Sequence, residues 1–155
     1  MMKTIQLRDV TVDDFPIFYD HQLDPDATRM AAFRPRDENA FMAHWAKILG
    51  NETGIKKTIL FDGQVAGNIV SFQQAGEREI GYWIGKRFWG QGVASKALSE
   101  FLGCETTRPL YAHVAKHNKG SLRVLEKCGF TIVGEDKEFF EADGEMIEGF
   151  VLRLG

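Results

Sequence analysis

Residues 84–94 read IGKRFWGQGVA, and they separate a strand-like segment from a helix-like one. The hydrophobic period changes here, from about two in residues 77–84 to about 3.6 in residues 93–103. Gly90 and Gly92 would let backbone N–H groups approach an anion without interference from side chains. The helix start adds the positive end of a dipole, and the two basic residues of the stretch add full charges. The stretch indicates a pyrophosphate-binding loop, although glycines needed only for a tight turn would give the same pattern.

The rest of the chain supplies strands and helices around this loop. Asp62-Gly63 is a strong hairpin signal, and Asn118 and Gly129 are expected to start and end the last helix. The expected strands are residues 4–10, 56–61, 64–72, 77–84, 110–115, 131–134 and 146–152, with a turn at Asp143-Gly144 between the last two. The expected helices begin at Thr11, Asp37, Gly90 and Asn118, and residues 23–36 are expected to be irregular.

Composition and charge narrow the class of protein. The chain has 155 residues, 44% apolar and 26% charged, which predicts one globular domain spanning residues 1–155. A net charge of −3 leaves no basic footprint for nucleic acid. Cys104 and Cys128 lack the spacing of metal or redox motifs. Nothing at the start resembles a signal peptide and no apolar run approaches about 20 residues, so we expect a cytoplasmic protein without a membrane partner.

Four blocks of sequence carry a resemblance to a known family. Residues 87–92, RFWGQG, look like the R/Q-x-x-G-x-G/A signature with which the GNAT superfamily of N-acetyltransferases binds pyrophosphate. Three further blocks resemble the branch of that superfamily that contains the ribosomal-protein alanine N-acetyltransferases. They are residues 79–84 (EIGYWI), 93–98 (VASKAL) and 118–130 (NKGSLRVLEKCGF). The resemblance covers nearly the whole chain, and it says much less about the acceptor than about the superfamily.

This resemblance implies an α/β (α+β) fold of the GNAT type. A mixed, mostly antiparallel seven-stranded sheet would splay between its fourth and fifth strands and be flanked by about four helices. It also implies an acetyl-CoA-dependent N-acetyltransferase with acetyl-CoA as acyl donor and no metal. In such enzymes the pantetheine arm lies along the fourth strand and pairs with its backbone.

Carried over position by position, the resemblance names the residues that would bind acetyl-CoA. The pantetheine would contact Tyr82, Trp83 and Ile84 largely through the main chain, with Asn118 on the opposite wall. The pyrophosphate would lie in the loop and the first helical turn, against Arg87, Phe88, Trp89, Gly90, Gln91, Gly92, Val93 and Ala94.

Direct attack by an amine requires the neutral amine. An α-amine with a pKa near 7.7–8.0 is roughly one-fifth neutral at physiological pH, and a lysine-like amine near 10.4 only about one-thousandth. A general base is therefore useful, and Glu79 on the fourth strand is the candidate, directly or through a water. Two alternatives stay open: Glu79 could be a solvated charge beside Arg78, and His113 could be the base.

The leaving thiolate needs a proton or a hydrogen bond. Many members of the superfamily place a tyrosine at the position of Leu125, and leucine cannot donate a proton. Ser121, in the first turn of the last helix, is therefore the candidate contact for the thiol of the cofactor. A serine at such a position can also be no more than a helix cap.

The sequence favours transfer of an acetyl group to a primary amine, either a protein N-terminus or a small molecule, by direct attack in a ternary complex. A monomer or a homodimer is expected. The alternative is a catalytically silent CoA-binding regulatory module, which would need neither Glu79 nor Ser121. A nucleotide-binding protein of another fold is disfavoured, because the sequence lacks the Walker A and dinucleotide-binding glycine motifs.

Overall fold

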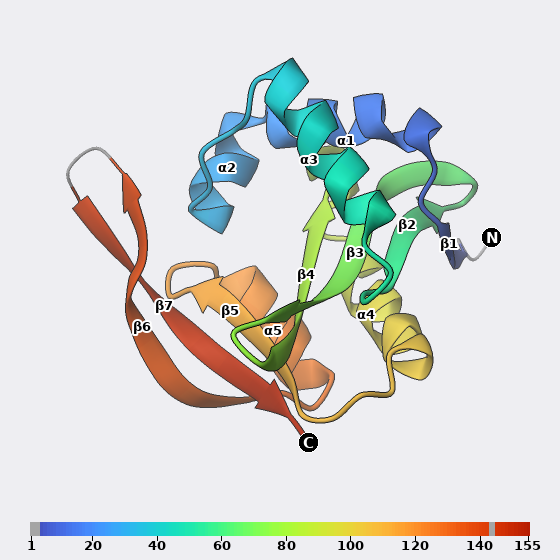
Figure 1. Ribbon diagram of the computed structural model, residues 1–155. Helices are drawn as coiled ribbons and strands as arrows, with labels where there is room; N and C mark the ends of the chain where they lie inside the picture. Colours follow the sequence, from blue (N-terminus) through green and yellow to red (C-terminus); the bar gives the residue numbers. More distant parts are fainter. Residues whose placement is uncertain (1–3, 143–144) are drawn as a thin grey trace.

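The computed structural model describes residues 4–142 and 145–155. They form a seven-stranded sheet in the order β1-β2-β3-β4-β5-β7-β6, with helices on both faces (Figure 1). The strands are β1 (Ile5–Asp9), β2 (Lys56–Phe61), β3 (Gln64–Gln74), β4 (Glu77–Ile84), β5 (Leu110–Ala115), β6 (Thr131–Ala142) and β7 (Glu145–Leu154). The helices are α1 (Phe15–Gln22), α2 (Pro25–Ala31), α3 (Glu38–Gly50), α4 (Val93–Cys104) and α5 (Lys119–Lys127).

The sheet opens between β4 and β5. These two strands run parallel, whereas the other neighbouring pairs are antiparallel. Within the described chain they pair only at Arg78 with Leu110 and at Glu79 with Tyr111, after which they diverge. The expected mixed sheet, splayed between its fourth and fifth strands, is therefore confirmed. Beyond Glu79 no described strand pairs with the edge of β4 that faces β5, so this edge is open, as in an edge strand.

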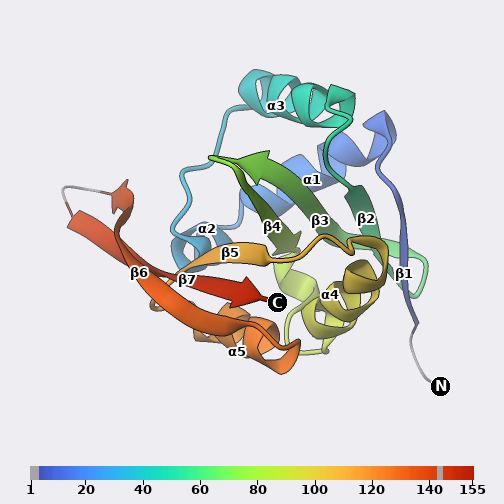
Figure 2. The same cartoon turned by 60° about the horizontal axis from the view of Figure 1, so that its bottom comes forward.

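Helices cover both faces of the sheet (Figure 2), and two apolar cores hold them to it. On one face Phe15, Phe18 and Trp45 pack between α1 and α3, with the rings of Phe18 and Trp45 4.9 Å apart. On the other face α4 and α5 bury side chains such as Leu98 and Phe101 against the strands. Each such buried side chain contributes about 1.5–3 kcal/mol. The two cores fix the strands on either side of the opening.

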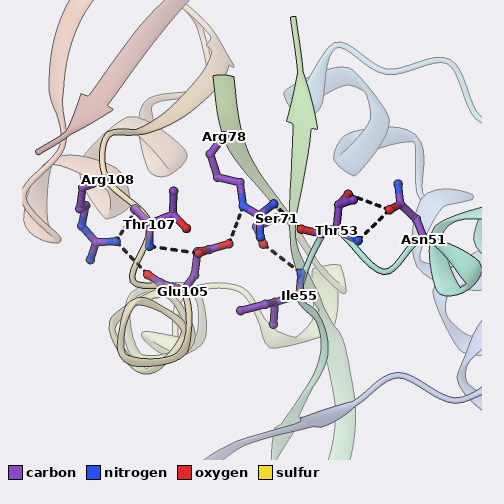
Figure 3. Close-up of polar contacts among 8 residues, drawn as sticks. All are labelled: Asn51, Thr53, Ile55, Ser71, Arg78, Glu105, Thr107 and Arg108. Atoms are coloured by element: carbon purple, nitrogen blue, oxygen red, sulfur yellow. Dashed lines mark hydrogen bonds and ion pairs between the residues drawn. The ribbon is translucent and has the colours of Figure 1, made fainter. Parts of the chain in front are cut away.

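A polar network holds the sheet together where β4 and β5 still pair (Figure 3). Glu105, which follows α4, is buried, and its Oε1 accepts a hydrogen bond from Arg78 Nε of β4 at 2.7 Å. Its Oε2 accepts from the N–H of Thr107 at 3.2 Å, and Arg108 Nη1 donates to its carbonyl at 2.8 Å. Burial alone would raise the pKa of Glu105, but its hydrogen bonds, led by that of Ser71, hold the pKa below its ordinary value. The network joins β3, β4 and the loop before β5.

Helix α2 lies in the segment expected to be irregular, so that expectation is wrong, and the described residues form five α-helices where about four were expected. Asp24 caps the helix, because its Oδ1 accepts from the N–H groups of Asp26 and Ala27 at 2.9 and 3.1 Å. Pro25 occupies the first turn, where its fixed φ suits a helix. The helix ends at Ala32, whose φ of 53° is left-handed. A proline that suggests a break therefore starts a helix here.

The last two strands are longer than expected. β6 continues past residue 134 to Ala142, and β7 begins at Glu145. The pairing of β6 with β7 shifts register after Ile132 and again after Asp136. These irregularities break the alternation of apolar and polar residues. The sequence pattern therefore does not predict the full length of β6. The turn expected at Asp143-Gly144 lies outside the described residues.

Candidate active site

Two adjoining cavities lie at the opening between β4 and β5. The larger has a volume of about 400 Å³ and is lined by α2, β4, the glycine loop and the starts of α4 and α5. The smaller, of about 120 Å³, is lined by β4, β5, α5 and part of β6. Four residues line both cavities: Ala31, Tyr82, Asn118 and Ser121. At these residues a ligand in the larger cavity would meet a ligand in the smaller one.

The glycine loop presents its main chain to the larger cavity. Gly90 and Gly92 have φ angles of 76° and 77°, which other residues adopt only with strain. No described atom lies within 4 Å of a Cβ built at either glycine, so both face open space. Trp89 Nε1 donates to the carbonyl of Ile84 at 2.9 Å and fastens the loop to β4. Because α4 begins at Val93, the unpaired N–H groups of its first turn lie at the same cavity, which fits a pyrophosphate.

The structure brings most of the predicted cofactor residues together. Those lining the larger cavity are Tyr82, Trp83, Ile84, Phe88, Trp89, Gly90, Gly92, Val93, Ala94, Asn118 and Ser121. Arg87 and Gln91 line a separate cavity of about 240 Å³ beside Gln64. Arg87 Nη2 donates to Gln64 Oε1 at 2.7 Å, and its guanidinium lies 4.6 Å from the centroid of the Phe88 ring. A contact of Arg87 or Gln91 with pyrophosphate stays a prediction.

Helix α2 supplies a wall of the larger cavity that the sequence did not reveal, through Ala27, Met30 and Ala31. Two contacts hold this helix over the site. His117 Nε2, in the loop before α5, is 2.8 Å from the carbonyl oxygen of Arg29. Lys86, beside the glycine loop, forms an ion pair with Asp26. The capping sequence that begins at Asp24 is the signal that could have located the helix.

Two hydroxyl groups meet where the cavities join. The Tyr82 hydroxyl of β4 lies 2.6 Å from Ser121 Oγ of α5. Asn118 Oδ1 accepts from the N–H of Ser121 at 3.2 Å, which confirms the predicted helix cap. Burial raises the pKa of Tyr82 to about 12, although the hydrogen bond with Ser121 opposes the shift. The phenol is therefore neutral near pH 7 and can donate a hydrogen bond. Leu125, at the position where a tyrosine is common, is buried and lines the smaller cavity.

Glu79 is buried, with 8% of its surface exposed. Arg78 pairs with Glu105, so the interpretation of Glu79 as a solvated charge beside Arg78 is wrong. Glu79 Oε1 lies 3.6 Å from His113 Nε2, and His113 Nδ1 lies 3.9 Å from Asp136 Oδ2. Burial raises the pKa of Glu79, and the charge of His113 opposes this shift. The sequence did not reveal Asp136, because the order of the strands that brings β6 near β5 leaves no spacing signal.

One buried donor lies near the larger cavity. Trp83 Nε1 is buried without a hydrogen-bond partner among the described residues, and such a donor suits a polar group of a bound molecule. Across residues 4–142 and 145–155, no group of three or more His, Cys, Asp or Glu side chains could hold a metal ion. Within the same residues, no helix combines the length and the apolar character that crossing a membrane requires.

The open edge of β4 leads from a helix start that suits a phosphate to a buried carboxylate, an arrangement suited to a CoA-dependent acyltransferase. The comparison with protein families specifies the class further. Residues 4–131 match the acetyltransferase (GNAT) domain, and the chain belongs to this family. It is an acetyl-CoA-dependent N-acetyltransferase. The resemblance found in the sequence is thereby confirmed.

Known proteins resemble the chain over most of its length. An uncharacterised N-acetyltransferase of Bacillus licheniformis, p20, is 22% identical over 97% of this chain and 92% of its own length. The L-amino acid N-acetyltransferase AaaT of Escherichia coli (strain K12) is 26% identical over 70% of this chain and 73% of its own. Among solved structures, the ribosomal L7/L12 alpha-N-protein acetyltransferase RimL, in complex with coenzyme A, has a TM-score of 0.82. The two chains are 19% identical, and the match covers 97% of this chain and 93% of the RimL chain.

Proposed function

We propose that the protein transfers the acetyl group of acetyl-CoA to a primary amine by direct attack in a ternary complex. The junction of the two cavities at Tyr82 and Ser121 is the observation that carries this proposal. The larger cavity suits acetyl-CoA along the free edge of β4, and the smaller leaves room for the amine beside His113. Holding both substrates at one junction supplies much of the catalysis through proximity alone.

Glu79 is the proposed general base, with His113 between it and the amine. His113 lines the smaller cavity, and its Nε2 is 3.6 Å from Glu79 Oε1. A carboxylate whose pKa is raised by burial is a better proton acceptor near neutral pH than a solvated one. The ammonium proton would pass to the imidazole or the carboxylate before the nitrogen attacks.

Ser121 is the proposed hydrogen-bond donor to the leaving thiolate, with Tyr82 as its support. A phenol with a pKa of about 12 cannot readily protonate a thiolate, whose conjugate acid has a pKa of about 8.5. The pair therefore acts by donating hydrogen bonds. If Tyr82 donates to Ser121 Oγ, the proton of Ser121 is free to point at the sulfur.

The acceptor is proposed to be a small-molecule amine or a protein N-terminus. Relatives support both classes, because AaaT is named for L-amino acids and RimL for a ribosomal protein. A cytoplasmic location is also proposed, since acetyl-CoA is available there. The alternative, a silent CoA-binding module, is disfavoured because a buried carboxylate beside a histidine is costly to keep without a use.

Release of free thiol from acetyl-CoA, measured against a panel of primary amines, tests the proposal. We expect amine-dependent release, together with a melting temperature that rises with acetyl-CoA. A ligand at about 100 times its Kd adds about 2.7 kcal/mol of stability. The silent module predicts the rise in melting temperature with no thiol release from any amine. An unchanged melting temperature with millimolar acetyl-CoA would contradict both functions.

A further inference from the structure

A bulge in β6 shapes the far wall of the smaller cavity. Asp136 pairs with Gly149 of β7 and Phe140 pairs with Ile147, so three residues of β6 lie opposite one residue of β7. Asp136 Oδ1 accepts from the N–H of Glu138 at 3.1 Å, which closes the bulge on itself. Bulges commonly redirect side chains beside active sites. Here the bulge brings Asp136 near His113, and it carries Phe139 into the wall of the cavity.

The absence of a side chain at Gly149 leaves space for the Phe139 ring. A Cβ at Gly149 would lie 2.6 Å from Phe139 Cδ1 and 2.9 Å from the carbonyl oxygen of Val114. A larger residue would push the ring away, because the carbonyl is fixed in the sheet. Glycine thus lets an apolar ring lie close over β7 and line the smaller cavity. The bulge and Gly149 together make an apolar wall beside a charged cluster.

The charged cluster beside this wall is acidic. Glu79 and Asp136 flank the imidazole of His113 at 3.6 and 3.9 Å, so two carboxylates share one imidazole. The cluster carries net negative charge whichever form His113 takes, provided both carboxylates are ionised. Among the described residues, no lysine or arginine lines either cavity. Lys116, the residue after β5, forms ion pairs with Glu135 and Glu148.

Two arginines of the segment before α3, Arg29 and Arg36, have partners that line neither cavity. Arg29 pairs with Asp26 at 2.5 Å, and Arg36 lies over the Phe33 ring with 5.4 Å between guanidinium carbon and ring centroid. Glu79 and Asp136 do not line the smaller cavity themselves, but both lie beside His113, which does. A cationic amine there would therefore have two carboxylates nearby, whereas a carboxylate would meet no lysine or arginine in the described lining.

We infer that the smaller cavity selects amines with a small apolar body and no carboxylate next to the nitrogen, which excludes free amino acids as the preferred acceptors. This inference rests on the proposed acetyl transfer and specifies its substrate class. Protonated alkylamines and N-terminal residues, whose carboxyl group is an amide, both meet the requirement. Asp136 is a specificity residue, because its charge acts on any carboxylate that enters beside the amine. Phe139 supplies the apolar contact.

Isoamylamine and leucine are the matched probes, because isoamylamine is leucine without its carboxylate. Repulsion between two like charges about 6 Å apart, such as a substrate carboxylate and a protein carboxylate, lowers the affinity for that substrate. The reduction is about threefold in water and about a hundredfold at an effective dielectric constant of about 20. Two carboxylates should therefore favour isoamylamine over leucine by at least about tenfold in kcat/KM, corrected for the neutral fraction of each amine. Leucinamide, which models a protein N-terminus, should also exceed leucine.

Asp136→Asn and the control Glu135→Gln separate charge from shape. Asp136→Asn should reduce the preference for isoamylamine over leucine by at least about threefold, by removing one like-charge contact. Glu135→Gln removes the charge of the preceding, exposed residue, which pairs with Lys116, and should leave the preference unchanged. Equal changes in both variants would overturn the role of Asp136.

The wild-type protein decides the inference itself. If leucine matches or exceeds isoamylamine, the substrate class is overturned while acetyl transfer stands. If none of the three amines supports thiol release, the acceptor assignment of the smaller cavity is overturned. The rise in melting temperature with acetyl-CoA and the wider amine panel then show whether the proposed function fails too.

Discussion

The Tyr82–Ser121 pair gives the sharpest prediction about the chemistry. Tyr82→Phe keeps the ring but removes the hydroxyl that lies 2.6 Å from Ser121 Oγ. We expect kcat to fall about tenfold, because Ser121 would lose the partner that orients its proton, while KM for acetyl-CoA changes little. Ser121→Ala removes the proposed donor itself and should lower kcat by about 10²-fold, as loss of one donor to a developing negative charge does elsewhere.

The effect on stability should be small. A typical intramolecular hydrogen bond contributes about 0.5–1.5 kcal/mol net, so Tyr82→Phe should cost about 1 kcal/mol. For a chain of this size that corresponds to about 2–4 °C in melting temperature. The variant should therefore fold and bind acetyl-CoA, which allows its kinetics to be measured. Because the pKa of Tyr82 is about 12, the wild-type profile should show no titration of Tyr82 between pH 6 and pH 10.

A double-mutant cycle tests whether Tyr82 acts through Ser121. Steady-state kinetics of both single variants and the double variant, with one amine at saturating acetyl-CoA, supply the four rates. If the reasoning is right, Tyr82→Phe has no further effect on kcat once Ser121 is alanine. If the two losses multiply instead, the hydroxyls act independently and the relay from Tyr82 to Ser121 is refuted.

Three other perturbations test the base, the glycine loop and acid stability. Glu79→Gln should lower kcat/KM about 10²–10⁴-fold near neutral pH. The pH–rate profile should show this loss shrinking as pH rises, because more of the amine is then already neutral. A uniform loss at every pH would mean that Glu79 only positions the acceptor. Gly92→Val should weaken acetyl-CoA binding at least about tenfold by calorimetry, whereas Gly76→Val, with a similar φ of 81°, should strain the backbone without affecting binding. Asp14 is buried, and although burial would raise its pKa, hydrogen bonds from Arg8, Thr11 and Thr58 lower it from 3.8 to about 2. A depressed carboxylate pKa stabilises the fold above the unfolded value, so Asp14→Asn should cost about 2 kcal/mol near pH 7. In urea melts, the difference in unfolding free energy between wild type and Asp14→Asn should disappear as pH falls through about 2. If Asp13→Asn loses as much stability, the hydrogen bonds of Asp14 are not the cause.

The sequence predicted those parts of the site that depend on short spacings. The glycine loop, the Asn118 cap and the Asp62-Gly63 turn each lie within a few residues and have the expected geometry. Helix α2 was not predicted, because Pro25 is read as a break unless the Asp24 cap before it is recognised. Asp136 was not predicted either, because it reaches His113 across β7 through a bulge. Contacts of that kind depend on strand order, and no local period records them.

The position of Glu79 follows from the way the sheet opens. Glu79 is the last residue of β4 that pairs with β5, one position after Arg78, whose pairing with Glu105 anchors the closed end. Successive residues of a strand point to opposite faces, so anchoring one directs the other away from that anchor. The carboxylate therefore lies at the closed end of the opening, buried beside His113, which lines the smaller cavity. Burial there raises the pKa of Glu79, and beyond it the strands diverge toward the cavity that we propose for the amine. For the base role that we propose for Glu79, the limited pairing of β4 and β5 would thus account both for its raised pKa and for its place beside the proposed amine cavity.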